Sequence, residues 1–359
     1  MRHISMWALA AIAMVIWVPG CGDDDDDAST GSGQAVDDDN DDDVDDDADD
    51  DDTDDDATDD DVDDDADDDV DDDDEVPLPV TPDVLLDGEF GETEGLAFLP
   101  DGRMFVQGDD GVHEIFGDGT YATRATFVDP LGLAHDGDGN ILVADYGDTS
   151  GFDFGDYEVD GSIVRMTPNG DKTTIATGIA DPNFIAVRDD GSLLVSDDFV
   201  TDMFLVPAGG GAPSVFTDAI EAANGLVFSL DRSVLYVCQT FINAGGILPD
   251  RRIWSVALDE NGDPGDVSLF VELPVGSAPD GAALDEEGRL YVAANLMGTI
   301  WRIDPAGPTV EKVADGMPFV ASLAFSRGGE FPETTLYATQ LVGGKIWSLD
   351  LGVAGAQLP

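Results

Sequence analysis

The sequence predicts an all-β fold, a six-bladed β-propeller, preceded by a signal peptide and a disordered Asp-rich linker. Three observations support this prediction. A short apolar pattern recurs six times from residue 92 onward, a turn containing Asp and Gly follows most copies, and no segment shows a sustained helical periodicity. Short strands, such turns and a repeat of about 40 residues are typical of propeller blades.

The first segment, residues 1–21, has the features of a bacterial lipoprotein signal peptide. Arg2 precedes an apolar run over residues 7–18, which is too short to cross a bilayer as a helix. The segment ends in Gly20-Cys21, and a small residue followed by cysteine at this point resembles a lipobox. We therefore expect lipidation of Cys21 and export to a bacterial membrane, on the periplasmic or cell-surface side of the outer membrane. An ordinary cleavable signal is the alternative.

Residues 22–78 are predicted to be a disordered acidic spacer. The tract 23–75 contains 34 Asp, one Glu and no Lys or Arg. Because it has almost nothing apolar to bury and its like charges repel, it cannot form a packed core. A polyvalent calcium buffer is the alternative. Folded calcium loops, however, need Gly and apolar anchors at set positions, and the tract has none.

The charge and cysteine content restrict the partners of the chain. Its formal net charge is −66, with 80 acidic residues against 14 Lys and Arg. Nucleic acids and anionic membrane surfaces require a basic surface, so we exclude both as partners and expect membrane contact only through the lipid anchor. Apart from Cys21 the only cysteine is Cys238, in an apolar run, which predicts a buried inert thiol and no intramolecular disulfide. We expect a monomer.

The folded part, residues 79–359, consists of six diverged repeats. Each repeat contains a quartet of small and apolar residues, and successive quartets are 37, 52, 41, 56 and 41 residues apart. Each quartet predicts the innermost strand of a blade. The quartets are residues 95–98, 132–135, 184–187, 225–228, 281–284 and 322–325.

Further strands follow each quartet. A second strand is expected after the turn, as in residues 139–145 and 288–293, and a third strand follows in most repeats. The clearest third strands are residues 163–166, 253–256, 300–303 and 346–349. The apolar segment 83–87 lies too early for the first repeat, and we expect it to supply an outer strand to the last blade and so close the ring.

The residue immediately before each quartet occupies the same place in every blade, at the entry of the innermost strand. In a propeller these entries surround the central channel at one end. The six residues of this column are Glu94, Leu131, Asn183, Asn224, Asp280 and Ala321. Any single Asn or Asp here could simply cap a turn. Four oxygen-bearing side chains in register favour a metal site, and with no His or Cys among them the set suits Ca²⁺, with Mg²⁺, Mn²⁺ or Zn²⁺ as substitutes.

Short motifs around this column carry a family likeness. The motifs are Glu94-Gly95, Asn224-Gly225 and Pro279-Asp280-Gly281. They resemble motifs of the senescence marker protein (SMP-30)/gluconolactonase/luciferin-regenerating enzyme family, and the likeness runs over residues 84–350. It implies that Glu94, Asn224 and Asp280 bind one divalent cation, and that Asn183 also faces the metal or the substrate.

The resemblance also implies a reaction, the hydrolysis of a lactone or a related ester. The metal would polarise the carbonyl group, and Asp280 would be both a metal ligand and the general base that activates water. Asn183 would orient the substrate or the water. The alternative is a non-catalytic, surface-displayed propeller that binds a ligand or a protein and retains a structural metal ion. A neighbouring base that ties up Asp280 would indicate this alternative.

The substrate pocket is expected to differ from that of the sugar lactonases. Asp181, Phe184 and Ala223 stand where that family commonly has Arg, Asp and Pro. Two long loops, residues 146–160 and 240–250, are placed to cover the mouth of the channel, since both connect the second and third strands of a blade. Their aromatic residues suggest a hydrophobic or aromatic substrate, and the alternative is that the loops pack only on themselves.

Overall fold

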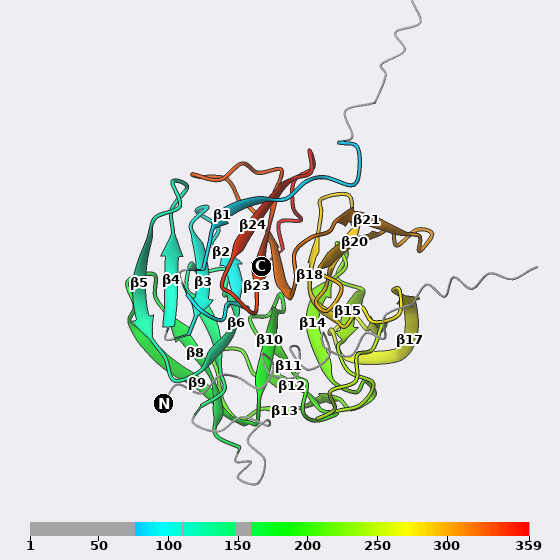
Figure 1. The fold of residues 1–359 in the computed structure, drawn as a ribbon. Helices are drawn as coiled ribbons and strands as arrows, with labels where there is room; N and C mark the ends of the chain where they lie inside the picture. The colour runs from blue at the N-terminus through cyan, green and yellow to red at the C-terminus, as the bar shows by residue number, and fades with distance from the viewer. Residues whose placement is uncertain (1–75, 89, 110, 148–158, 359) are drawn as a thin grey trace, which may run out of the picture. The chain divides into compact units, whose positions relative to one another are not determined.

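The computed structural model describes residues 76–88, 90–109, 111–147 and 159–358, and these form an all-β fold of six four-stranded antiparallel sheets (Figure 1). This confirms the predicted six-bladed propeller. The predicted signal peptide, Cys21 with its expected lipidation, nearly all of the predicted spacer 22–78 and the middle of the loop 146–160 lie outside the described residues. Within those residues, no helix has the length and hydropathy needed to cross a membrane.

Five of the six blades are built from four consecutive strands, each paired with the next along the chain. Blade 1 contains β2 (Leu96–Phe98), β3 (Met104–Gly108), β4 (Gly111–Ile115) and β5 (Tyr121–Thr126). Blade 2 contains β6 (Pro130–His135), β7 (Ile141–Asp145), β8 (Gly161–Met166) and β9 (Lys172–Ile179). Blade 3 contains β10 (Pro182–Val187), β11 (Leu193–Asp197), β12 (Met203–Val206) and β13 (Ser214–Thr217).

The next two blades follow the same order. Blade 4 contains β14 (Ala223–Phe228), β15 (Val234–Gln239), β16 (Arg252–Leu258) and β17 (Pro264–Glu272). Blade 5 contains β18 (Pro279–Leu284), β19 (Leu290–Ala294), β20 (Thr299–Ile303) and β21 (Val310–Ala314). The quartets identified in the sequence therefore lie in the first strand of each blade, as predicted.

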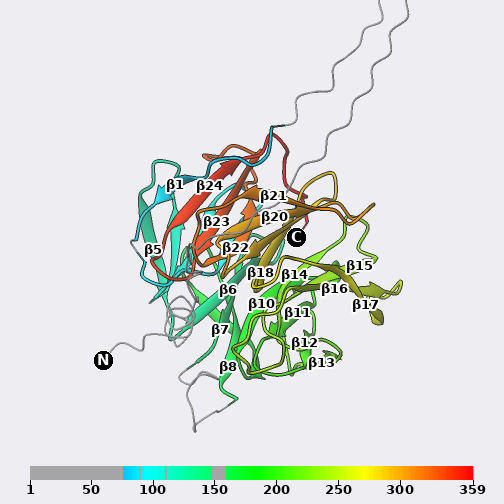
Figure 2. The same cartoon turned by 45° about the vertical axis from the view of Figure 1, so that its right-hand side comes forward.

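The sixth blade joins the two ends of the folded chain. It contains β22 (Val320–Phe325), β23 (Thr335–Gln340), β24 (Ile346–Asp350) and β1 (Asp83–Leu86). β1 pairs antiparallel with β24, with Val84 opposite Trp347, and the two strands lie side by side in Figures 1 and 2. The predicted closure by residues 83–87 is confirmed.

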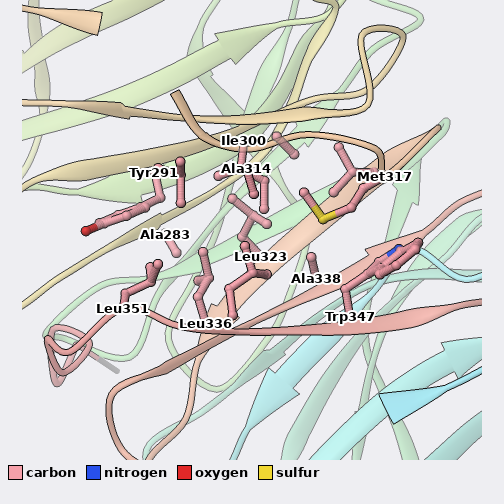
Figure 3. Close-up of a cluster of buried hydrophobic side chains, with 14 of the residues drawn as sticks. Ala283, Tyr291, Ile300, Ala314, Met317, Leu323, Leu336, Ala338, Trp347 and Leu351 are labelled. Atoms are coloured by element: carbon pink, nitrogen blue, oxygen red, sulfur yellow. The ribbon is translucent and has the colours of Figure 1, made fainter. Parts of the chain in front are cut away.

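The hydrophobic core lies between neighbouring blades rather than in one central mass. The cluster between blades 5 and 6 is an example: Tyr291 and Ile300 pack against Leu323 and Leu336, with Met317 from the connecting segment (Figure 3). Four of these side chains are at most 1% exposed. Each such side chain contributes about 1.5–3 kcal/mol to the free energy of unfolding, so the blades are held in fixed orientations around the channel.

The C-terminal segment after β24 packs against the channel at the end where the innermost strands finish. The amide of Ala356 donates to the carbonyl oxygen of Leu284 over 2.9 Å, and a side-chain nitrogen of Arg327 donates to the carbonyl oxygen of Leu358. Ala356 and Leu358 line a cavity of about 170 Å³ together with residues of the innermost strands such as Phe98. This end of the channel therefore has a wall made by the chain terminus.

Candidate metal and active site

Three of the four oxygen-bearing column residues, Asn183, Asn224 and Asp280, lie at irregular points in the innermost strands, and Glu94 lies just before β2. In blades 2 to 6 the pairing of the first with the second strand shifts register around the column residue; in blade 3, for example, it shifts between Pro182 and Ile185. Such bulges change the direction of a side chain. The entry is also strained in blades 4 and 5, where Ala222 and Ala278 have φ of 45° and 49°, a region that disfavours side chains other than glycine.

Glycines after the column residues allow neighbouring innermost strands to approach closely. An ideal Cβ at Gly132 would lie 1.9 Å from the carbonyl oxygen of Asn183, and one at Gly225 would lie 2.2 Å from that of Asp280. Where blade 6 meets blade 1, the hydroxyl of Thr339 donates to the carbonyl oxygen of Glu94 over 2.7 Å. The column residues therefore follow one another around the same end of the channel.

The four predicted metal-binding residues share an unusual property. All four side chains are buried, with exposed fractions of 1–3%, and each has one acceptor oxygen without any hydrogen-bond donor. These oxygens are Glu94 Oε1, Asn183 Oδ1, Asn224 Oδ1 and Asp280 Oδ1. Buried acceptors are normally paired, because an unpaired one costs about 1–3 kcal/mol, and four on four different blades require an explanation.

The two carboxylates lie close enough to raise each other's energy in the ionised state. Burial raises the pKa of Glu94 well above its ordinary value, and the charges of Asp280 and Asp198 raise it further. Burial raises the pKa of Asp280 to about 7, although hydrogen bonds from Asn295 and from the Gly281 amide lower it. A cation between the two carboxylates would remove this repulsion and supply the missing partner for the unpaired oxygens.

A hard divalent cation fits this donor set. Carboxylate and amide oxygens without His or Cys are the ligands preferred by Ca²⁺, and Zn²⁺ is disfavoured for the same reason. No cluster of three or more His, Cys, Asp or Glu that could hold a metal occurs among the described residues. The candidate set is consistent with this, since only Glu94 and Asp280 are acids and the other two members, Asn183 and Asn224, are amides.

The remaining two column residues have apolar side chains. Leu131 is half-buried and Ala321 is fully buried. The oxygen set is therefore contributed by blades 1, 3, 4 and 5.

The structure adds two polar residues that the sequence did not indicate. The side-chain amide of Asn295 donates to Asp280 Oδ2 over 2.8 Å, and that of Asn183 donates to the hydroxyl of Tyr146 over 3.4 Å. Asn295 and Tyr146 each follow the second strand of a blade by one residue, so a comparison of the strand ends could have found them. The side chain that donates to Asp280 is an amide and not a base, so the neighbouring base expected for a non-catalytic binder is not the partner of Oδ2.

The loop 240–250 lies at the same end of the channel as the column. The hydroxyl of Thr240 donates to the carbonyl oxygen of Pro279 over 2.7 Å, next to Asp280, and the amide of Gly245 donates to the carbonyl oxygen of Asp198 over 3.2 Å. Within the loop Phe241 is buried, whereas Leu248 is 56% exposed. The predicted position of this loop near the mouth is therefore observed.

Comparison with known proteins connects this architecture with one family. Residues 201–341, which include Asn224 and Asp280, match the family model described as the SMP-30/Gluconolactonase/LRE-like region, so the resemblance seen in the motifs is confirmed over this stretch. A 6-deoxy-6-sulfogluconolactonase of Pseudomonas putida is 33% identical over 127 residues. The match covers 35% of this chain and 40% of that protein, less than half of either.

Solved structures extend the likeness to the whole propeller. A gluconolactonase of Xanthomonas campestris superposes with a TM-score of 0.59 at 20% identity, over 75% of this chain and 88% of that one. Regucalcin of Agrobacterium tumefaciens, a calcium-binding protein, gives 0.59 at 19% identity, over 77% and 95% of the two chains. At these identities the likeness establishes the propeller fold alone.

Proposed function

We propose that this propeller is a hydrolase of lactones or related esters that depends on a divalent cation, most suitably Ca²⁺. The observation that carries the proposal is the set of four buried acceptor oxygens without donors, one from each of four blades. The family match over residues 201–341 and the sulfogluconolactonase relative support the lactonase type of reaction.

The proposed cation ligands are Glu94, Asn183, Asn224 and Asp280. When bound, a divalent cation supplies Lewis acidity for the substrate carbonyl and for the negative charge that develops on its oxygen. The chain itself supplies a buried, water-poor position in which the donors are already fixed by the bulged strand entries. Because these four oxygens accept no hydrogen bond among the described residues, none has to be broken before a cation binds.

Asp280 is the proposed general base. Without a cation, burial raises its pKa to about 7, and a bound cation would favour the deprotonated carboxylate, which is the form that accepts a proton from water. The water oxygen forms a bond with the carbonyl carbon, the ring C–O bond breaks, and the proton passes from Asp280 to the leaving alkoxide, which gives a hydroxy acid. Asn295, bonded to Oδ2, keeps the carboxylate in one orientation, and Asn183 orients the substrate or the water.

The test is a panel of lactones measured with and without a chelator. We expect hydrolysis of at least one lactone in calcium, loss of the rate in excess chelator, and recovery when Ca²⁺ is added back. Equilibrium dialysis should give one tightly bound calcium ion per chain. A rate that is unaffected by the chelator would contradict the metal-dependent mechanism.

We propose further that the protein acts as an exported monomer attached to a bacterial membrane through lipidated Cys21, with residues 22–78 as a spacer. This proposal rests on the sequence features of residues 1–21 and on the acidic composition of the tract 23–75.

A further inference from the structure

The residue that follows the second strand of a blade is a second set of positions at the site end of the channel. In blades 2 to 6 the last residue of the second strand pairs with the residue just before the column residue; in blade 3, Asp197 pairs with Pro182. The next residue along the chain therefore lies beside the column. These strand-exit residues are Tyr146, Asp198, Thr240, Asn295 and Leu341.

Three of the four polar strand-exit residues bind a residue at the entry of an innermost strand. Asn295 donates to Asp280, Tyr146 accepts from Asn183, and Thr240 donates to the carbonyl oxygen of Pro279. Each of these hydrogen bonds pairs the polar group of the strand-exit residue and also holds the strand entry beside it in position.

Asp198 is the exception. Its side chain is completely buried, yet within the part of the chain that the structure describes neither carboxylate oxygen accepts a hydrogen bond from another residue. The adjacent Asp197 shows the usual arrangement, because it accepts from the amides of Asp181, Phe199 and Val200 at 3.0–3.3 Å. Burying a carboxylate without hydrogen-bond donors costs free energy of folding. The local backbone amides bind Asp197 and not Asp198, so Asp198 can bind another partner.

The position of Asp198 relates it to the oxygen set. Its backbone carbonyl is bound by Gly245 of the loop at the mouth. The charge of Asp198 raises the pKa of Glu94 and of Tyr146, in addition to the larger effect of burial on each. The pKa of Asp198 is raised mainly by burial, and the charge of Asp280 raises it further. Glu94 and Asp280 belong to blades 1 and 5, which do not adjoin blade 3, so Asp198 interacts with them across the channel; Tyr146 belongs to the adjoining blade 2.

The charge balance of the site identifies the missing partner. A divalent cation would compensate Glu94 and Asp280, but it leaves Asp198 without a positive partner, and burial raises the pKa of Asp198 well above its ordinary value until such a partner binds. Asp181, also completely buried, adds a further negative charge that raises the pKa of Asp198. Arg, Lys or His would be the ordinary partner, but neither oxygen of Asp198 contacts one.

We propose that Asp198 binds a positively charged group of the substrate, and that the site therefore acts on lactones or esters that carry an ammonium group. This inference rests on the proposed function, because it assigns the substrate class of the same site. An ammonium group donates up to three hydrogen bonds and would satisfy both free oxygens of the carboxylate. A second divalent cation is the alternative occupant; it needs several further ligands, and the calcium stoichiometry of Asp198→Asn distinguishes the two.

The test compares an amino lactone with its neutral analogue. The probes are α-amino-γ-butyrolactone and α-hydroxy-γ-butyrolactone, measured at a pH where the amine is protonated. We expect the full-length, calcium-loaded protein to prefer the amino lactone, and the ratio of the two kcat/KM values to fall by about 10- to 100-fold in Asp198→Asn. Asp198→Glu should retain much of the preference. The control Asp218→Asn removes an exposed charge from the same blade and should leave the ratio unchanged.

Direct binding separates this inference from the proposed function. Calorimetry with n-butylammonium and n-butanol needs no turnover, and we expect only the ammonium compound to bind and Asp198→Asn to abolish the binding. If no lactone is hydrolysed but this difference is found, the hydrolase proposal fails and the cation subsite stands. If lactones are hydrolysed but neither probe pair shows a preference, the subsite is overturned. A calcium stoichiometry of two that falls to one in Asp198→Asn would also overturn it, in favour of a second metal.

Discussion

The side-chain amide of Asn295 donates to Oδ2 of Asp280 over 2.8 Å and leaves Oδ1 of the same carboxylate without a donor. One oxygen is thus used to orient the group, and the other is available to a ligand. Both residues belong to blade 5, Asp280 in its first strand and Asn295 directly after its second, so their relation is fixed within one sheet.

Replacing Asp280 by Asn should abolish most of the activity. The variant keeps the shape of the side chain but removes both the base and one cation ligand, so we expect kcat to fall by at least about 100-fold and calcium binding to weaken. Activity on the best lactone and calcium titration provide the measurement. Asp266→Asn, at an exposed position of blade 4, is the matched control, and a variant at 280 with full activity would refute the assigned role.

Asn295→Ala should shift the pH dependence rather than only reduce the rate. The hydrogen bond from Asn295 lowers the pKa of Asp280, so its removal raises that pKa further. In the pH profile of kcat/KM, the acidic limb should move to higher pH, and kcat should fall by about 10-fold through loss of orientation. A lower rate with an unmoved pH profile would mean that Asn295 supports the fold and not the base.

The stability of the metal-free protein should decrease as the pH rises. Burial raises the pKa of Asp280 from 3.8 to about 7, so the folded state holds its proton more tightly than the unfolded state does. The stabilisation from this proton is complete below the unfolded pKa and is lost as the pH rises through about 7. Glu94 shifts in the same direction.

Calcium should reverse this trend, since the cation needs the deprotonated carboxylates and competes with protons. We expect the Tm in chelator to fall between about pH 5 and pH 8, and the increase in Tm caused by Ca²⁺ to grow over the same range. Asp280→Asn should flatten both curves. A calcium effect that is equal at all pH values would show that the cation binds elsewhere.

Gly225→Ala should disturb the packing of the innermost strands without removing any polar side chain. The new Cβ would lie 2.2 Å from the carbonyl oxygen of Asp280, so the innermost strands of blades 4 and 5 must separate. We expect a loss of about 1–3 kcal/mol in the free energy of unfolding, together with weaker calcium binding. Gly307→Ala is the control, because a Cβ there meets no atom within 4 Å and should leave both properties unchanged.

Cys21→Ser should release the protein from the membrane. If Cys21 carries the lipid, the wild-type protein should partition into detergent and incorporate a labelled fatty acid, and the variant should do neither. Lactone hydrolysis by the released protein should persist, because the propeller begins after the spacer. Membrane attachment that survives the substitution would favour another form of anchoring.

The repeat carried most of the information that predicted the fold. The quartets, the Asp-Gly turns and the early segment 83–87 were sufficient for six blades and for closure, because strand order follows from repetition alone. The column of Glu94, Asn183, Asn224 and Asp280 was visible for the same reason. Each of these residues stands at a fixed offset from a recognisable strand.

The strand-exit residues were not found in the sequence, and the reason is geometric. Asp198, Asn295 and Tyr146 lie one residue beyond the second strands, where side-chain direction depends on the register shift in the neighbouring strand. The sequence pattern does not state that shift. The sequence also does not show which of the adjacent residues Asp197 and Asp198 accepts hydrogen bonds from the backbone amides.

The C-terminal segment that packs at the far end of the channel has a consequence for exchange with solvent. Because Ala356 and Leu358 line the cavity at that end and narrow it, we expect a molecule held by the four column oxygens to enter and leave on the side of the loop 240–250. A hydroxy acid formed at the ring would retain the carboxylate and hydroxyl oxygens that a hard cation binds. If the proposed hydrolysis occurs, product release and substrate binding would therefore use the same opening, and release of the hydroxy acid would limit the turnover rate.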